Sequence, residues 1–466
     1  MLEQLASINW STLSHAYGPA EDVPQLLRDL TSPDEQKRGH ALGTLYTNIY
    51  HQGTVYQASA YAAPFLIELA QQEAVLERDE ILVLLAHLAQ GNTYHRQHWH
   101  FYSEERRRDP TIQAELEEGI FWVEKTYEAV AAGLPLYASL LAHPDAKIRM
   151  AAPRVLGMLF HEAPQVVPVL CERFDGESDQ RVQASLLYAV GALLARQEER
   201  HERGWQLLVR ALESSPSEFV RLAAAMALGR TRRPEIPTRA FDALLETFTH
   251  YTVLAEIYEE LPWANMRLVF DLIRSFYEVP QPAQEYVLPR VMNVLNSLDQ
   301  MEEQGELKLN GLVAGELAEL LITLAFGAPD EGPAKARMRK DLTNLQYALL
   351  SAILHSDVVW RWDVGKGHSM TSRPLGVQED GEERHETIVE VRLYELLKYG
   401  LPDTRQALRA FLGEEPREQD VIRIVSRQEN IHWTPEEQKE EVLAELIALN
   451  QHCQLADLKM LIGDYS

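Results

Sequence analysis

Residues 215–229 read SPSEFVRLAAAMALG, a turn followed by a helix rich in alanine and leucine, and three other stretches follow the same scheme. The four stretches begin at Ser32, His143, Ser178 and Ser215. Gly157, Gly191 and Gly229 occupy the same late position in the last three, where a small residue lets a second helix approach closely. These three follow one another at a spacing typical of helix-pair repeats, roughly 34 to 47 residues. The chain is therefore expected to fold as an array of helical hairpins.

The start of the repeated helix carries a capping signal. Ser32 and Ser215 are each followed by a proline and, three residues after the serine, by Glu35 or Glu218. This order predicts serine as the N-cap, proline as the first helical residue and glutamate as the third, because proline is tolerated at that first position and glutamate can bond back to the cap.

The four stretches resemble HEAT repeats, including the bacterial HEAT-like repeats related to phycobilisome lyases, over residues 22–249. Three shorter segments, 15–24 (HAYGPAEDVP), 48–56 (NIYHQGTVY) and 399–405 (YGLPDTR), resemble the opening and closing parts of a family of bacterial HEAT-repeat proteins. That family has no general assigned activity. The resemblance implies an α-solenoid and leaves the function open.

We predict an all-α fold, an α-solenoid of HEAT-type helical hairpins that forms an α–α superhelix. The predicted parts are an N-terminal repeat array (1–249) with an insertion (91–111), degenerate helical repeats (250–354), and C-terminal helical hairpins (355–466) with an insertion (357–385). Insertions in solenoids form loops on one face, often the binding face. Ala152 is expected to lie where the inner helices meet.

The composition restricts the classes of partner. The chain has 466 residues with 70 acidic and 44 basic side chains, a formal net charge of −26. Such a charge repels polyanions, so nucleic-acid binding, which needs clustered lysine and arginine, is not expected. There are two cysteines, no signal-peptide pattern and no apolar run long enough to span a membrane. We expect a cytoplasmic protein with no membrane partner and no cofactor.

The first insertion contains the sequence YHRQHWHFY, residues 94–102. His95, His98 and His100 are candidate metal ligands because imidazole is the commonest neutral ligand, although their spacing matches no zinc signature. The alternatives are contact with a partner, or a polar and aromatic insertion packed on the array. The candidate partner-binding residues are Tyr94, Arg96, Trp99 and Tyr102.

A second candidate segment follows the first repeated helix. His51, Gln52 and Tyr56 flank Gly53, which can adopt a backbone conformation that other residues avoid. These three side chains are candidate binding residues. In the alternative interpretation, which we prefer, His51 and Gln52 hydrogen-bond the free carbonyls at a helix end.

The second insertion opens with Trp360, Arg361 and Trp362, residue types that often anchor protein interfaces. Either they form a binding edge, or they fix the loop to the helical array. In the first case, Trp99→Ala or Trp360→Ala is expected to abolish partner binding while the melting temperature stays nearly unchanged.

Arg38, Arg149 and Arg221 recur at the same repeat position. They could bind phosphates along a groove, but a structural role is expected, in which they pair with acidic residues such as Asp34 and Asp145.

Three His-Glu pairs begin at His161, His201 and His385, and they do not share a repeat position. The resemblance to the HEAT-like deoxyhypusine hydroxylases, whose His-Glu pairs hold two irons in register, therefore fails. We expect a non-catalytic protein–protein interaction scaffold with an acidic concave surface that binds another protein. The alternatives are an immunity or accessory protein that neutralises a basic toxin, and a HEAT-like DNA-repair glycosylase or other nucleic-acid-binding protein.

Overall fold

The chain forms two compact units, Met1–Pro280 and Gln281–Ser466. The computed structural model describes residues 2–197, 201–264, 268–279, 284–303, 311–327, 329, 332, 334–361, 367–378, 382–427, 439–450 and 459. Within these residues no helix combines the length and the apolar character needed to cross a membrane.

The first unit is mostly helical. Its α-helices are α1 (Val23–Asp29), α2 (Glu35–Asn48), α3 (Gln57–Gln71), α4 (Arg78–Gln90), α5 (Tyr94–Gln97), α6 (Glu104–Arg107), α7 (Pro110–Ala131), α8 (Leu134–Leu140), α9 (Ala146–Leu156), α10 (Ala163–Asp175), α11 (Gln180–Leu194), α12 (Glu202–Ser214), α13 (Glu218–Arg230), α14 (Arg239–Glu246), α15 (Tyr251–Glu259) and α16 (Leu268–Glu278). Its 3-10 helices are η1 (Glu3–Ser7), η2 (Trp10–Thr12), η3 (Trp99–Phe101), η4 (Phe160–Glu162) and η5 (Thr247–His250). Two short hairpins are formed by β1 (Ser14–His15) with β2 (Gly18–Pro19) and by β3 (Tyr50–His51) with β4 (Thr54–Val55).

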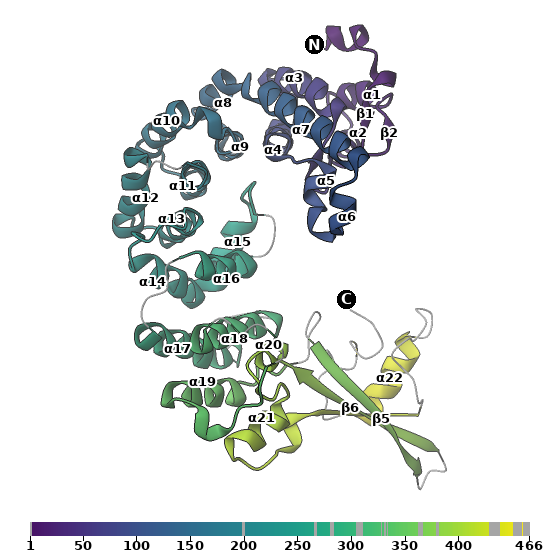
Figure 1. Cartoon of the computed structure of the whole chain (residues 1–466), viewed down its shortest axis with the longest axis vertical. Coiled ribbons are helices and arrows are strands. Elements are labelled where there is room, and N and C mark those ends of the chain that lie inside the picture. The colour runs from purple at the N-terminus through teal and green to yellow at the C-terminus, as the bar shows by residue number, and fades with distance from the viewer. Residues whose placement is uncertain are drawn as a thin grey trace. The chain divides into compact units, whose positions relative to one another are not determined.

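The helices of the first unit form two layers. In Figure 1, α8, α10, α12 and α14 lie on the outside of an arc, whereas α9, α11 and α13 lie on its inside. The inner helices pack in chain order, α4 on α9, α9 on α11, α11 on α13 and α13 on α16. Ala152 of α9 is fully buried, as expected for a residue where inner helices meet.

The repeated arginines have the structural role that the sequence favoured. The Nη1 atom of Arg38 donates to the carbonyls of Ser32 and Pro33, and the corresponding atoms of Arg149 and Arg221 donate to the equivalent pairs of carbonyls. Their acidic partners differ from those expected, because Arg38 pairs with Glu77 at 2.8 Å and Arg149 with Glu177 at 3.0 Å.

The predicted caps are wrong by two residues. Asp34 caps α2 and Ser217 caps α13, with side chains that accept hydrogen bonds from the first-turn amides. Asp145 likewise caps α9, so it is a cap and not the partner of Arg149. The reason is the repeated arginine that follows each turn, Arg38 or Arg221. Because it binds the carbonyls of the Ser-Pro pair, that pair stays outside the helix as part of the turn.

Gly191 marks a close approach between inner helices. A Cβ atom added there would lie 2.7 Å from the carbonyl oxygen and 2.8 Å from the Cα of Ala227 in α13. Because these are backbone atoms, α11 and α13 would have to separate. We expect Gly191→Ala to lower the free energy of unfolding by about 1–3 kcal/mol, measured by urea denaturation.

Gly43 provides the control for Gly191. It lies on the exposed side of α2, and no atom lies within 4 Å of an added Cβ. Gly43→Ala should therefore stabilise the protein by about 0.5–1 kcal/mol, the ordinary gain of alanine over glycine in a helix. Equal responses at the two positions would contradict the close packing at Gly191.

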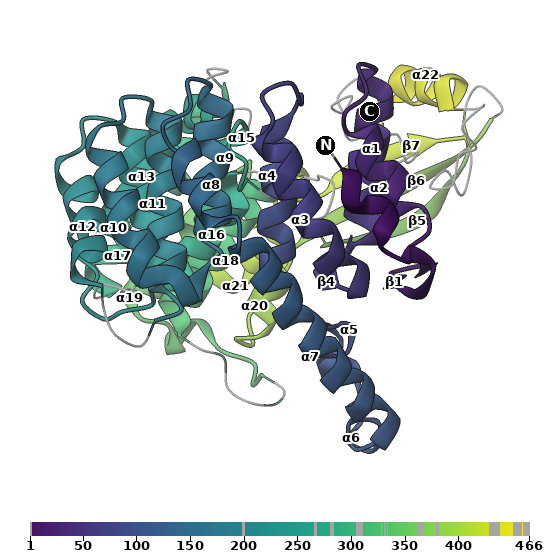
Figure 2. The ribbon, with the colours of Figure 1, turned by 90° about the horizontal axis from the view of Figure 1, so that it is seen from above.

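An arm leaves the first unit after α4. Figure 2 shows α5, α6 and the first part of α7 extending away from the other helices of this unit. The predicted insertion at 91–111 thus forms the short helices α5, η3 and α6, of which α5 and α6 pack against the long helix α7.

The second unit combines helices with a sheet. Its helices are α17 (Gln284–Glu303), α18 (Gly311–Phe326), η6 (Arg339–Asp341), α19 (Asn344–His355), α20 (Tyr394–Leu397), α21 (Arg405–Leu412), η7 (Glu418–Asp420) and α22 (Lys439–Leu449). Its strands are β5 (Gly367–Val377), β6 (Glu383–Arg392) and β7 (Ile422–Ser426). They form an antiparallel sheet in the order β5-β6-β7, with Gly367 opposite Arg392 and His385 opposite Ser426.

This sheet corrects the sequence prediction for residues 355–466. An all-α fold with helical hairpins is wrong over β5–β7, and the predicted insertion 357–385 contains the whole of β5. The missed signal lies in β6, where Thr387, Val389 and Val391 are buried and alternate with more exposed residues. This period of two and the β-branched side chains are typical of a strand with one buried face.

Candidate interaction surface

The structure brings together two candidate segments that lie far apart in the sequence. The β3–β4 hairpin turns at Gln52 and Gly53, whose φ angles of 49° and 91° both lie in the left-handed region. Two such residues make the tight turn that suits a two-residue hairpin. A Cβ added to Gly53 would lie 3.4 Å from the side chain of Gln97, so the turn packs against α5. His51 and Gln52 therefore lie next to the arm.

Aromatic and imidazole rings line this region. The Tyr17 hydroxyl lies 3.3 Å from Nδ1 of His51, and the two rings pack edge to face. On the arm, the rings of Tyr94 and His98 are 4.3 Å apart, and Phe101 lies 6.3 Å from His98. We call these five residues the N-terminal aromatic surface.

Three of its rings are strongly exposed. The exposed fractions are 66% for Tyr17, 52% for Tyr94 and 75% for Phe101. Tyr56 lies behind them, half-buried and bonded at 2.7 Å to the Thr54 hydroxyl. Burial raises the pKa of Tyr56, and the neighbouring phenols of Tyr17 and Tyr94 raise it further. The candidate residues His51, Tyr56 and Tyr94 thus belong to one neighbourhood.

The histidines of the arm have internal partners. Nδ1 of His95 lies 2.9 Å from the Tyr102 hydroxyl and Nε2 lies 2.9 Å from Glu115. Nδ1 of His98 lies 2.9 Å from the Tyr94 carbonyl, and the ring of His100 packs on Phe101. Within the described ranges, no group of three His, Cys, Asp or Glu side chains could hold a metal ion. The arrangement of His95, His98 and His100 therefore supports an internal role.

The other candidate residues on the arm differ in how exposed they are. Tyr102 is buried, and the Arg106 guanidinium lies 4.2 Å above its ring. Trp99 is half-buried, and its carbonyl accepts two hydrogen bonds from Arg107. Arg96 is exposed and adds a positive charge to the surface. Trp99 and Tyr102 are thus held within the arm.

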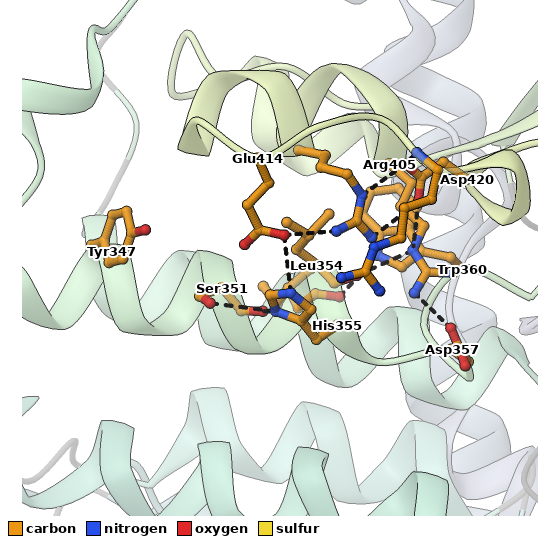
Figure 3. A network of polar contacts seen from close by, with 12 residues as sticks. Tyr347, Ser351, Leu354, His355, Asp357, Trp360, Arg405, Glu414 and Asp420 are labelled. Carbon is orange, nitrogen blue, oxygen red and sulfur yellow. Dashed lines mark hydrogen bonds and ion pairs between the residues drawn. The ribbon is translucent and has the colours of Figure 1, made fainter.

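Two of the candidates in the second unit, Trp360 and Arg361, belong to the described residues, and neither is fully exposed. Trp360 is only 6% exposed, and its indole Nε1 donates to the Ile353 carbonyl at 2.8 Å (Figure 3). The interpretation of Trp360 as an exposed interface anchor is therefore wrong. Arg361 is half-buried, and its backbone amide donates to the Val358 carbonyl. Trp362 lies outside the described residues.

A recess in the first unit carries excess negative charge. This cavity of 510 Å³ lies where the first turns of α4, α9 and α11 meet the end of α15. Its charged residues are Asp79, Glu80, Lys147, Arg181, Glu259 and Glu260. Burial raises the pKa of Glu80, and its acidic neighbours Asp79 and Glu77 raise it further. A positively charged group placed here would relieve this repulsion.

Comparisons with known proteins give little guidance. No family model and no curated protein matches the chain. Among solved structures, a chain from a complex of Kap95p with RanGDP is similar, with 14% sequence identity and a TM-score of 0.31. The match covers 72% of this chain and 42% of that chain, so this protein spans less than half of its length. A likeness of that degree carries no argument about function.

Proposed function

We propose that this protein is a non-catalytic interaction scaffold that docks another protein on the N-terminal aromatic surface. The observation that carries the proposal is the exposure of Tyr94 in α5, Phe101 in η3 and Tyr17 in the turn between β1 and β2. Exposed aromatic rings are costly in water and are enriched at protein interfaces. Neighbouring imidazole rings restrain them, so little side-chain freedom remains to be lost on binding.

The charge of the chain favours a basic partner. The net charge of −26 and the carboxylates of the 510 Å³ cavity both attract lysine and arginine side chains. An immunity or accessory protein that neutralises a basic toxin is one specific form of this function. Electrostatic attraction of this kind predicts association that slows as salt is added.

The test is a pair of substitutions on the arm. Tyr94→Ala and Phe101→Ala should each weaken partner affinity by about 30-fold, the effect of losing an interface hot spot worth about 2 kcal/mol. Both side chains are exposed, so the melting temperature should stay nearly unchanged. The partner is first identified by mass spectrometry after capture with the wild-type chain, and the affinity of the purified pair is then measured by calorimetry.

Tyr277 provides the matched control. It is 51% exposed and lies in α16 of the same unit, remote in sequence from the arm. Tyr277→Ala should leave partner affinity unchanged. If all three variants bind the partner as the wild type does, the N-terminal aromatic surface is not the docking site.

A further inference from the structure

The inner face of the first unit carries a cluster of guanidinium and phenol groups in which neither arginine forms an ion pair with a carboxylate of the described residues. It comprises Tyr46 of α2, Tyr50 of β3, His87 of α4, Arg154 of α9, Tyr188 of α11 and Arg230 of α13. The rings of Tyr46 and Tyr50 lie 5.7 and 5.0 Å from that of His87. The guanidiniums of Arg154 and Arg230 lie 5.8 and 3.9 Å from the centre of the Tyr188 ring.

Arg154 is buried with no carboxylate partner among the described residues. It is 3% exposed, and its Nε atom has no hydrogen-bond partner. Its other bonds are weak, one to the Gln90 amide oxygen at 3.3 Å and one to the Met158 sulfur at 3.9 Å. Burial lowers the pKa of Arg154, and the neighbouring Arg230 lowers it further. A buried cation is costly unless a negative charge accompanies it, so this site lacks its counterion.

Arg409 in the second unit shows what a compensated buried arginine looks like. It is fully buried, and two of its nitrogens bind the Asp420 carboxylate at 2.7 and 3.0 Å. Neither Arg154 nor Arg230 has an ion pair with any carboxylate of the described residues. The contrast shows that the inner-face cluster lacks the compensation that Asp420 gives Arg409.

The cluster is fixed in place by an aromatic support. Trp263 stacks on Tyr188 with ring centres 4.2 Å apart, and its indole Nε1 donates to the Ser185 hydroxyl at 3.2 Å. Since Trp263 covers one face of Tyr188, Arg230 lies above the other. Both guanidiniums are therefore held near one phenol before any ligand arrives.

Neutral hydrogen-bond donors surround the guanidiniums. Arg154 interacts electrostatically with the phenols of Tyr46, Tyr50 and Tyr188. In the described part of the chain, none of these three hydroxyls has a hydrogen-bond partner. Burial raises the pKa of Tyr46 and of Tyr50, so both stay protonated and able to donate. Burial, aided by Arg154, lowers the pKa of His87 to about 4, so this ring is neutral at pH 7.

We propose that the inner-face cluster is a binding site for a phosphate group, either as free phosphate or as the phosphate of a small monoester. Guanidinium groups and phenol hydroxyls are the donors that phosphate oxygens accept from. Gln90 is exposed and bonds Arg154, whereas Arg230 is half-exposed. The anion is expected to displace the Gln90 amide from Arg154 and to contact Arg230 from the solvent side.

The probes are inorganic phosphate and glycerol phosphate, with ionic strength held constant by sodium chloride. Calorimetry should detect binding of at least one probe to the wild-type chain, and binding should raise its melting temperature. Arg230→Met and Arg154→Met should each weaken binding about tenfold or more, as expected for loss of a charge-assisted contact. Binding of inorganic phosphate alone would identify the free anion, and stronger binding of glycerol phosphate would identify a monoester.

Two further variants separate binding from folding. Tyr188→Phe keeps the ring on which Arg230 lies and removes only its hydroxyl, so it should weaken binding less than either arginine change. Arg210→Met, on the outer helix α12 where Arg210 pairs with Asp175 at 2.5 Å, should bind as the wild type does. Without phosphate, Arg154→Met should melt at or above the wild-type temperature, because an uncompensated buried charge has been removed.

Three outcomes would overturn the assignment. The first is a wild-type melting temperature that responds equally to phosphate and to chloride. The second is phosphate binding that persists unchanged in Arg230→Met. The third is tight, salt-dependent binding of duplex DNA that Arg154→Met abolishes, which would make the site part of a nucleic-acid groove.

Discussion

Trp360→Ala is expected to lower the free energy of unfolding of the second unit by about 3–5 kcal/mol. The side chain is 6% exposed, and its indole Nε1 bonds the Ile353 carbonyl at the C-terminal end of α19. Truncation leaves a large cavity and removes the indole hydrogen bond from the Ile353 carbonyl, which then keeps only the long bond from the Ser356 amide at 3.4 Å. The change should appear in urea denaturation and as faster amide hydrogen exchange along α19.

Trp99→Ala provides the comparison. Trp99 is half-buried on the arm, where its contacts are with Arg107 and Tyr102. Its removal should therefore cost less stability than the removal of Trp360. Unchanged stability of Trp360→Ala together with loss of partner binding would restore the interpretation of Trp360 as an interface anchor.

The repeat register was predictable because it depends on local sequence. Each repeat reuses small residues at fixed positions, and Gly157 and Gly191 do lie against the next inner helix. The structural role of the arginines was predictable for the same reason, since each binds carbonyls five and six residues before it. The caps were misplaced because those same bonds keep the Ser-Pro pair out of the helix, and a capping signal confined to the first turn does not include the arginine.

The sheet of the second unit was less accessible to sequence reasoning. Residues of β5 are mostly exposed, so the strand shows no buried face that would give a period of two. Its polar composition therefore favoured a loop. Only β6 shows the alternation of buried and more exposed residues that is typical of a strand. It lies next to segments with clear helical signals in the sequence.

The inner-face cluster escaped detection because its six members come from six separate elements. No short motif joins Tyr46, His87 and Arg230. A partial signal existed, since Arg154 and Tyr188 each lie three residues before the repeated glycine, at Gly157 and Gly191. Residues at one repeat position come side by side on neighbouring inner helices. A comparison of side-chain chemistry across repeats at each position would have found them.

Arg409 and Asp420 form a buried ion pair in the second unit, and Figure 3 shows Asp420 within its network of polar contacts. Both side chains are fully buried, and they share two hydrogen bonds. Burial opposes the ionisation of Asp420, but Arg409 and the Arg417 amide hold its pKa below the usual value. Asp420 therefore stabilises the fold above its unfolded-state pKa, and this contribution is lost as the pH falls through the lower folded-state value.

Arg409→Met should lower the free energy of unfolding by about 3–5 kcal/mol, because it leaves Asp420 charged and buried. Arg405, 3.6 Å from the carboxylate, can compensate only in part. The double variant Arg409→Met with Asp420→Leu should recover most of the loss, since replacement of both partners by apolar groups is often nearly neutral. Urea denaturation of the two single variants and the double variant gives the coupling energy directly.

Lys398→Met is the control for this pair. Lys398 is exposed and pairs with Glu395, so its loss should cost less than about 1 kcal/mol. If Arg409→Met costs no more than this surface change, the Asp420 carboxylate is reached by water or is protonated in the folded chain. Arg409 also binds Glu414 at 2.7 Å, and Glu414 contacts His355 at 3.2 Å. If the double variant is as unstable as Arg409→Met alone, the arginine stabilises the fold through Glu414. The comparison of the single and double variants therefore separates two contributions to the free energy of unfolding: the cost of an unpaired buried charge, and the loss of contacts around α19 and α21.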